Sequence, residues 1–125
     1  MTYHRTHIPD DVAALLSQGC VIPAHPLALD ESRALDPRRQ RALARYYLDA
    51  GADGLAVGVH ATQFAIREAG LYEQILELAS VTIDDWVNRP VAKIGGLAGP
   101  TKQAVNEAKT AVGLGYHAGL LSLAA

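Results

Sequence analysis

Length, composition and charge limit the classes of protein to which this chain can belong. Its 125 residues allow one domain, and with 50% hydrophobic and 19% charged residues the composition is that of a globular protein. The formal net charge of -2 provides no basic surface for nucleic acid. The single cysteine, Cys20, excludes a disulfide framework and fits a reducing, cytoplasmic setting. No stretch approaches the ~20 apolar residues of a membrane span, so we expect no membrane partner.

Hydrophobic periodicity and turn residues predict helices that alternate with short apolar strands. The predicted strands are about Gly19–Ala24, Gly54–Val59, Val91–Ile94 and His117–Leu123. Two of the predicted helices are about Pro9–Gln18 and Gln63–Ser80, the second with an interruption near Gly70. Another has Asp36 as its cap and Pro37 as its first helical residue, and it ends at Gly51. The last has Thr101 as its cap and ends at Gly113. The chain therefore alternates between the two kinds of element.

This alternation predicts an α/β fold. Strands separated by helices pair in parallel and connect through right-handed crossovers. The near-continuous apolar run Gly54–Val59 suits a strand that is covered on both faces. A complete barrel needs eight βα units and ~250 residues. We therefore expect about four strands that form the N-terminal half of a (β/α)8 barrel, as one partial domain over residues 1–125.

Two sequence motifs resemble a known family. The first, VIPAHPLALD, occupies Val21–Asp30, and the second, GVHATQF, occupies Gly58–Phe64. The later stretch RPVAKIGGLAGPTKQAVNEAKTAVGLGYHAGLLSL follows them in order. Together they are similar to the dihydrodipicolinate synthase / N-acetylneuraminate lyase family, and more narrowly to a branch known only as dihydrodipicolinate synthase family protein. The resemblance covers about residues 19 to 125.

The resemblance implies a (β/α)8 barrel that acts as a class I aldolase or lyase and needs no cofactor. In the family, a 2-oxo acid such as pyruvate forms a Schiff base with a lysine on the sixth strand, and a tyrosine on the fifth strand relays protons. This chain ends at the predicted fourth strand, so both residues would lie beyond residue 125. We therefore expect a truncated lyase that contains no catalytic residue and is inactive alone. Lys93 lies on the third strand, so we expect packing or an ion pair there.

The resemblance also implies a substrate-binding turn. The family's Gly-Thr-Thr-Gly-Glu turn, which holds the substrate carboxylate, corresponds to the segment that begins at Gly58. Val59 and His60 fall where the two threonines stand, and the second glycine and the glutamate have no counterpart.

The position of the polar residues supports binding at this turn. His60 lies at the C-terminal end of a strand, which is the catalytic face of a barrel, and directly before a helix, whose free N–H groups suit a carboxylate. Thr62 and Gln63 follow in the same turn, and His25 follows the preceding strand on the same face. Helix capping would equally explain His60 or Thr62. We expect no metal, because no carboxylate at ligand spacing accompanies the two histidines.

Two other classes of function remain open. One is a small stand-alone α/β module that binds a ligand. The other is a half-barrel that associates with itself, because its first and last strands would be open edges. We expect a homo-oligomer with a small-molecule 2-oxo acid as ligand, and neither nucleic acid nor membrane as partner.

Overall fold

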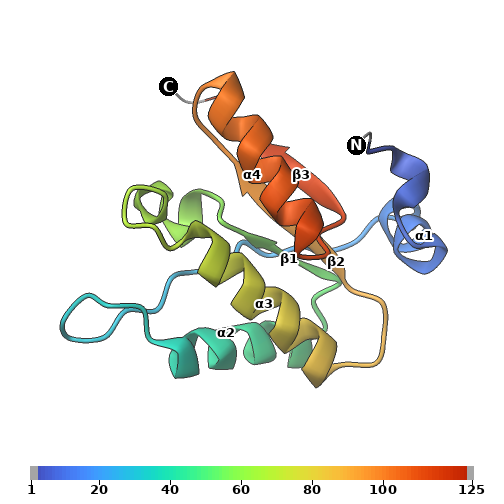
Figure 1. Ribbon diagram of the computed structural model, residues 1–125. Coiled ribbons are helices and arrows are strands. Elements are labelled where there is room, and N and C mark those ends of the chain that lie inside the picture. Colours follow the sequence, from blue (N-terminus) through green and yellow to red (C-terminus); the bar gives the residue numbers. More distant parts are fainter. Residues whose placement is uncertain (1–2, 124–125) are drawn as a thin grey trace.

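The computed structural model describes residues 3–123 and contains a parallel sheet with helices packed along it (Figure 1). The strands lie in the order β1 (Gly54–Val57), β2 (Ala92–Leu97) and β3 (Ala118–Leu121). The helices are α1 (Asp10–Gln18), α2 (Pro37–Asp49), α3 (Tyr72–Trp86) and α4 (Thr101–Gly113). Short 3-10 helices occupy Arg5–His7 (η1), His60–Thr62 (η2) and Phe64–Ile66 (η3). The predicted α/β class and parallel pairing are confirmed.

The predicted first strand, Gly19–Ala24, is wrong, so the sheet has three strands instead of four among the described residues. This segment does lie beside β1, because Ala24 forms a single parallel bridge with Ala56. Two prolines flank the bridge and limit the pairing: Pro23 directly before it has no N–H to donate, and Pro26 follows two residues after it. Upstream, the Val21 N–H donates to the Asp53 carboxylate instead of to a strand carbonyl.

The start of α2 follows from local signals. Asp36 is the N-cap, its carboxylate accepts from the Arg39 N–H at 3.1 Å, and Pro37 is the first helical residue, as predicted. The predicted cap of α4 is wrong by one residue, since Pro100 holds the cap position and its carbonyl accepts from the Ala104 N–H. Thr101 is therefore the first residue of the helix.

The predicted helix Gln63–Ser80 is correct only in its second part. Gln63 has a φ of +76° and Gly70 a φ of +73°, and neither value is compatible with a right-handed helix. The first part therefore contains only the short helix η3, and α3 begins at Tyr72. It then continues past Ser80 to Trp86.

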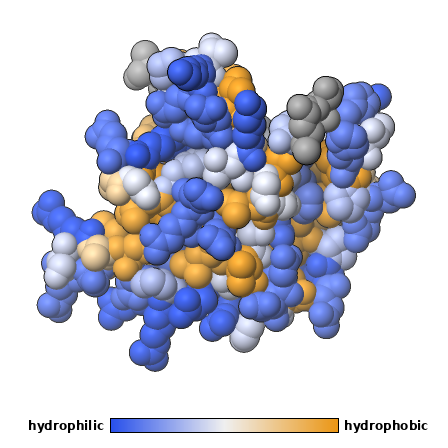
Figure 2. All heavy atoms as spheres, viewed as in Figure 1, coloured by the Kyte–Doolittle hydropathy of each residue, from blue (hydrophilic) through white to orange (hydrophobic). Residues whose placement is uncertain are grey.

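One apolar cluster joins the helices to the sheet. α2 and α3 lie next to each other below β1, and α4 lies along β2 and β3 (Figure 1). The cluster includes Leu48 of α2, Leu55 and Val57 of β1, Leu76 of α3 and Ala111 of α4. Polar and charged residues gather on the outer faces of the helices, and apolar residues show between them (Figure 2). Among the described helices, none is long and apolar enough to cross a membrane.

Candidate substrate-binding turn and its support

The turn Gly58–Gln63 follows the C-terminal end of β1 and is fixed by Thr62. Gly58 has a φ of +79°, which favours glycine, and its N–H donates to Thr62 Oγ1 at 3.1 Å. The Thr62 hydroxyl donates in turn to the carbonyl of His25 at 2.6 Å. Thr62 is fully buried, so it supports the turn from within and ties it to the loop after the first predicted strand.

The outer side of the same turn is accessible. His60 is exposed and makes an edge contact with the Phe64 ring, at 5.4 Å between centroids. Gln63 is also exposed. The backbone N–H groups of Val59, His60 and Ala61 donate no hydrogen bond to other residues of the 3–123 range. Val59 is buried, whereas His60 and Ala61 are exposed, so the turn has exposed residues with unpaired N–H groups at the carboxyl end of a parallel strand.

His25 has a different environment from His60. It is fully buried, its Nδ1 lies 2.7 Å from the Pro26 carbonyl, and its ring meets Tyr47 of α2 edge-on at 6.3 Å. Gln40 of α2 lies 3.1 Å from the same nitrogen. Burial lowers the pKa of His25, and the hydrogen bond to the Pro26 carbonyl opposes this in part. The structure thus joins His25 to the turn through its backbone carbonyl, while its ring packs against α2.

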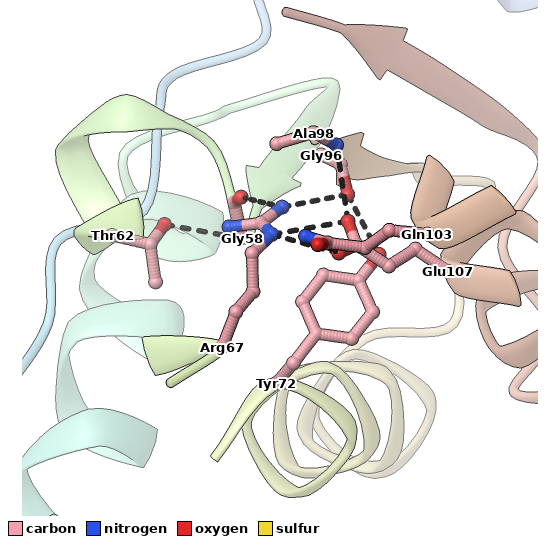
Figure 3. Close-up of polar contacts among 8 residues, drawn as sticks. All are labelled: Gly58, Thr62, Arg67, Tyr72, Gly96, Ala98, Gln103 and Glu107. Atoms are coloured by element: carbon pink, nitrogen blue, oxygen red, sulfur yellow. Dashed lines mark hydrogen bonds and ion pairs between the residues drawn. The ribbon is translucent and has the colours of Figure 1, made fainter. Parts of the chain in front are cut away.

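A buried arginine supports the turn from the helix side (Figure 3). The Arg67 side chain is only 10% exposed, and its Nη2 donates to the Gly58 carbonyl at 2.9 Å and to the Gly96 carbonyl at 3.2 Å. Its Nε lies 3.0 Å from both carboxylate oxygens of Glu107 in α4. Its Nη1 is buried without a hydrogen-bond partner among the described residues. One side chain therefore connects the ends of β1 and β2 to α4.

Glu107 and Tyr72 complete this network. Glu107 also accepts from the Ala98 N–H at 3.1 Å and from Gln103 Nε2 at 2.9 Å. The Tyr72 hydroxyl donates to the Gly96 carbonyl at 2.6 Å, and the Arg67 guanidinium lies 4.8 Å from the centre of the Tyr72 ring. Burial raises the pKa of Tyr72, the Glu107 charge adds to this, and the Arg67 charge opposes it. The tyrosine therefore stays a neutral hydrogen-bond donor.

A cavity of about 530 Å³ adjoins this network. Phe64, Arg67, Tyr72, Gln103 and Glu107 line it, together with Glu68 and the Ala98-Gly99 turn. Sequence patterns did not predict this cluster, because its two charged members are 40 residues apart. The one available signal was that Arg67 lies close behind the predicted binding turn.

A second ion pair, in which the lysine is buried and the aspartate is exposed, lies at the opposite, amino-terminal end of the strands. Lys93 Nζ donates to Asp84 at 2.8 Å and to Ser80 Oγ at 2.9 Å, which confirms that Lys93 forms an ion pair. His117 Nδ1 accepts from the Lys93 backbone N–H at 2.9 Å. Burial and the Lys93 charge lower the pKa of His117, while Asp11 and Asp84 oppose the shift. Residues 3–123 contain no group of three or more His, Cys, Asp or Glu that could hold a metal ion.

No family model matches the sequence, and no curated protein matches it. The fold does match solved structures. CdNal from Clostridium difficile, in complex with mannosamine, has a TM-score of 0.73 at 22% identity over 82% of this chain and 34% of its own. Dihydrodipicolinate synthase from Aquifex aeolicus has a TM-score of 0.72 at 20% identity, over 82% of this chain and 33% of its own. YagE, a prophage protein of the dihydrodipicolinic acid synthase family from E. coli K12 in complex with pyruvate, has a TM-score of 0.72 at 21% identity, over 82% of this chain and 33% of its own.

These matches define the fold of the chain. The described part is a partial (β/α) barrel of the kind found in dihydrodipicolinate synthase and N-acetylneuraminate lyase structures. The chain spans about a third of the length of these structures.

Proposed function

We propose that this chain is part of a lyase of the dihydrodipicolinate synthase / N-acetylneuraminate lyase type and that the Gly58–Gln63 turn binds the carboxylate of a 2-oxo acid such as pyruvate. The observation that carries the proposal is the row of unpaired backbone N–H groups of Val59, His60 and Ala61 at the carboxyl end of β1. Ligands of α/β folds bind at this edge of the sheet. The fold neighbour YagE was solved in complex with pyruvate.

The residues of the turn divide into two roles. Val59 contributes its N–H, and His60 and Gln63 contribute exposed side chains that can donate to a carboxylate. Thr62 and His25 hold the turn in place through the Thr62 hydroxyl and the His25 carbonyl. In this proposal the turn contributes binding of the 2-oxo acid, and the Schiff-base lysine and relay tyrosine of the family have no assigned counterpart among residues 3–123.

The test combines binding with covalent trapping. Pyruvate should shift the amide NMR signals of Val59, His60 and Ala61, and borohydride should trap no pyruvate on the 125-residue chain. His60→Ala should weaken binding, whereas His4→Ala, which changes an exposed histidine of the amino-terminal segment, should leave it unchanged. The absence of shifts at the turn would refute carboxylate binding. A trapped adduct would show that the chain carries its own nucleophilic lysine.

A second proposed property is self-association in a reducing, cytoplasmic setting. All four residues of the edge strand β3 are exposed, and such an edge can pair with another chain. We expect a light-scattering mass above that of one chain. A mass equal to 13.3 kDa at all concentrations would exclude self-association.

A further inference from the structure

We propose that Arg67, together with Glu107, is a positioning pair that sets the geometry of two turns at the carboxyl edge of the sheet, Gly58–Gln63 and Ala98–Pro100. This inference rests on the proposed function of the first turn and assigns it a support that lies outside the turn. Neither residue contacts the ligand in this proposal.

The first step is the orientation of the peptide between Gly58 and Val59. Arg67 Nη2 holds the Gly58 carbonyl at 2.9 Å, and Thr62 Oγ1 holds the Gly58 N–H at 3.1 Å. In a trans peptide, the carbonyl and the following N–H point in opposite directions. The Val59 N–H is therefore directed away from the Gly58 carbonyl and from Arg67.

The second step is the link to the neighbouring turn. Arg67 Nη2 also donates to the Gly96 carbonyl, and Glu107 accepts from the Ala98 N–H. The same ion pair therefore holds the carboxyl ends of β1 and β2 in one arrangement (Figure 3). A lysine at position 67 would keep the charge but would lose the planar fork that reaches Glu107 and two carbonyls at once.

The third step is that little else can replace these contacts. Gly96 has no side chain, and a Cβ there would collide with the Gly58 carbonyl, so no side chain fits between Gly96 and the start of the turn. The Gly96 carbonyl accepts from both Arg67 and Tyr72, and Arg67 lies between the two strand ends and α4. Removal of the guanidinium would leave the Gly58 carbonyl without its donor.

A matched arginine allows a direct test. Arg89 also donates to two backbone carbonyls, those of Ala52 and Leu48, at 2.8 Å each, and it makes no contact with either turn. Arg67→Gln should weaken pyruvate binding about tenfold or more, because a charged hydrogen bond to the turn is lost. Arg89→Gln should leave the affinity unchanged, although both variants lose stability. Binding is measured by NMR titration under conditions where both are folded by circular dichroism.

The outcomes separate the positioning role from simple stabilisation. Arg67→Gln should shift the amide signals of both turns, and Glu107→Gln should shift them in the same direction. Equal pyruvate affinity in the Arg67 and Arg89 variants would overturn the proposal. If Arg67→Gln fails to fold, Arg67→Lys replaces it. This variant should bind pyruvate more weakly than the wild type and Arg89→Gln do, but still measurably. Wild-type affinity in Arg67→Lys would also overturn the proposal.

Failure of the proposed function gives a distinct result. If the wild type does not bind pyruvate, carboxylate binding is refuted while positioning is still measured by hydrogen exchange. The Thr62 and Gln63 amides, which bond to Val59 and His60, should then exchange faster in Arg67→Gln than in Arg89→Gln. Equal exchange in the two variants would overturn the positioning role.

Discussion

β1 and β3 are both four-residue apolar strands, yet their environments are opposite. Leu55 and Val57 of β1 are 0% exposed, whereas Leu120 and Leu121 of β3 are 55% and 54% exposed. β1 pairs with β2 on one edge and bridges to Ala24 on the other, and α2 and α3 cover it. β3 pairs with β2 alone. Strand formation in this fold therefore depends on sequence, but burial depends on which neighbours are present.

The uncovered side of β3 has a definite shape. A groove of about 740 Å³ runs between β3 and α4 and is lined mostly by apolar side chains, among them Leu97, Val105, Leu121 and Leu123. Parallel strands are normally covered on both faces. The part of the chain that matches the fold neighbours spans only about a third of their length, so their barrels contain further strands that this comparison leaves unmatched.

The largest expected effect tests the covered strand. Leu55→Ala should lower the free energy of unfolding by about 2–5 kcal/mol, because it opens a cavity in a closed part of the core. Leu121→Ala on β3 should cost far less, because this side chain already meets solvent. Urea denaturation of both variants measures the difference. Equal losses would mean that β3 is covered in solution.

A smaller effect tests the contact between β1 and β2. Gly96→Ala places a methyl group against the Gly58 carbonyl and should cost about 1–3 kcal/mol as the strands separate. Gly113→Ala is the control, because a Cβ there meets nothing within 4 Å. Because Gly113 is the last residue of α4, its replacement by alanine should stabilise the helix by up to about 1 kcal/mol. Thermal unfolding that moves both variants in the same direction would contradict this.

The beginning of β3 should respond to pH. Because the pKa of His117 lies below its ordinary value of 6.5, the unfolded chain binds more protons than the native one between these two values. Stability should therefore be highest above pH 6.5, fall as the pH drops toward the native pKa, and level off below it. His117→Gln can still accept from the Lys93 N–H and should reduce this slope, while buried His25, whose pKa is also lowered, accounts for the part that remains. An unchanged slope in the variant would exclude His117 as its source.

The smallest effect concerns the exposed edge itself. A Leu121→Thr, Leu123→Thr variant should change the free energy of unfolding by less than about 0.5 kcal/mol, since both side chains are largely exposed. It should nevertheless reduce self-association, measured by light scattering, because threonine keeps the strand propensity and removes apolar surface. Undiminished association would place the contact elsewhere on the molecule.

Local signals predicted much of the fold. The Asp36-Pro37 pair gave the start of α2, and the apolar runs beginning at Gly54 and His117 gave β1 and β3. These signals are predictive because they act within a few residues, as a helix cap or the fixed φ of proline does. The strand predicted at Gly19–Ala24 is wrong because the spacing of apolar residues does not reveal that Pro23 and Pro26 limit the pairing to one bridge.

The candidate site was predictable only in part. The turn at Gly58 could be located from sequence, but the roles within it depend on residues distant along the chain. Thr62 was expected to cap a helix or to contact a ligand. In the structure its hydroxyl donates a hydrogen bond to the carbonyl of His25, 37 residues away. Arg67 and Glu107 were not predicted, because no periodic pattern links residues 40 positions apart.

The separation of Arg67 from Glu107 also has a consequence for the order of assembly. A growing polypeptide reaches Arg67 well before Glu107, and the loop between them must close before the ion pair can form. Contacts of this range form late relative to local helices and turns. During synthesis, the Gly58–Gln63 turn would therefore exist first as a loosely held loop, and it would acquire its final shape only once α4 has emerged from the ribosome and docked.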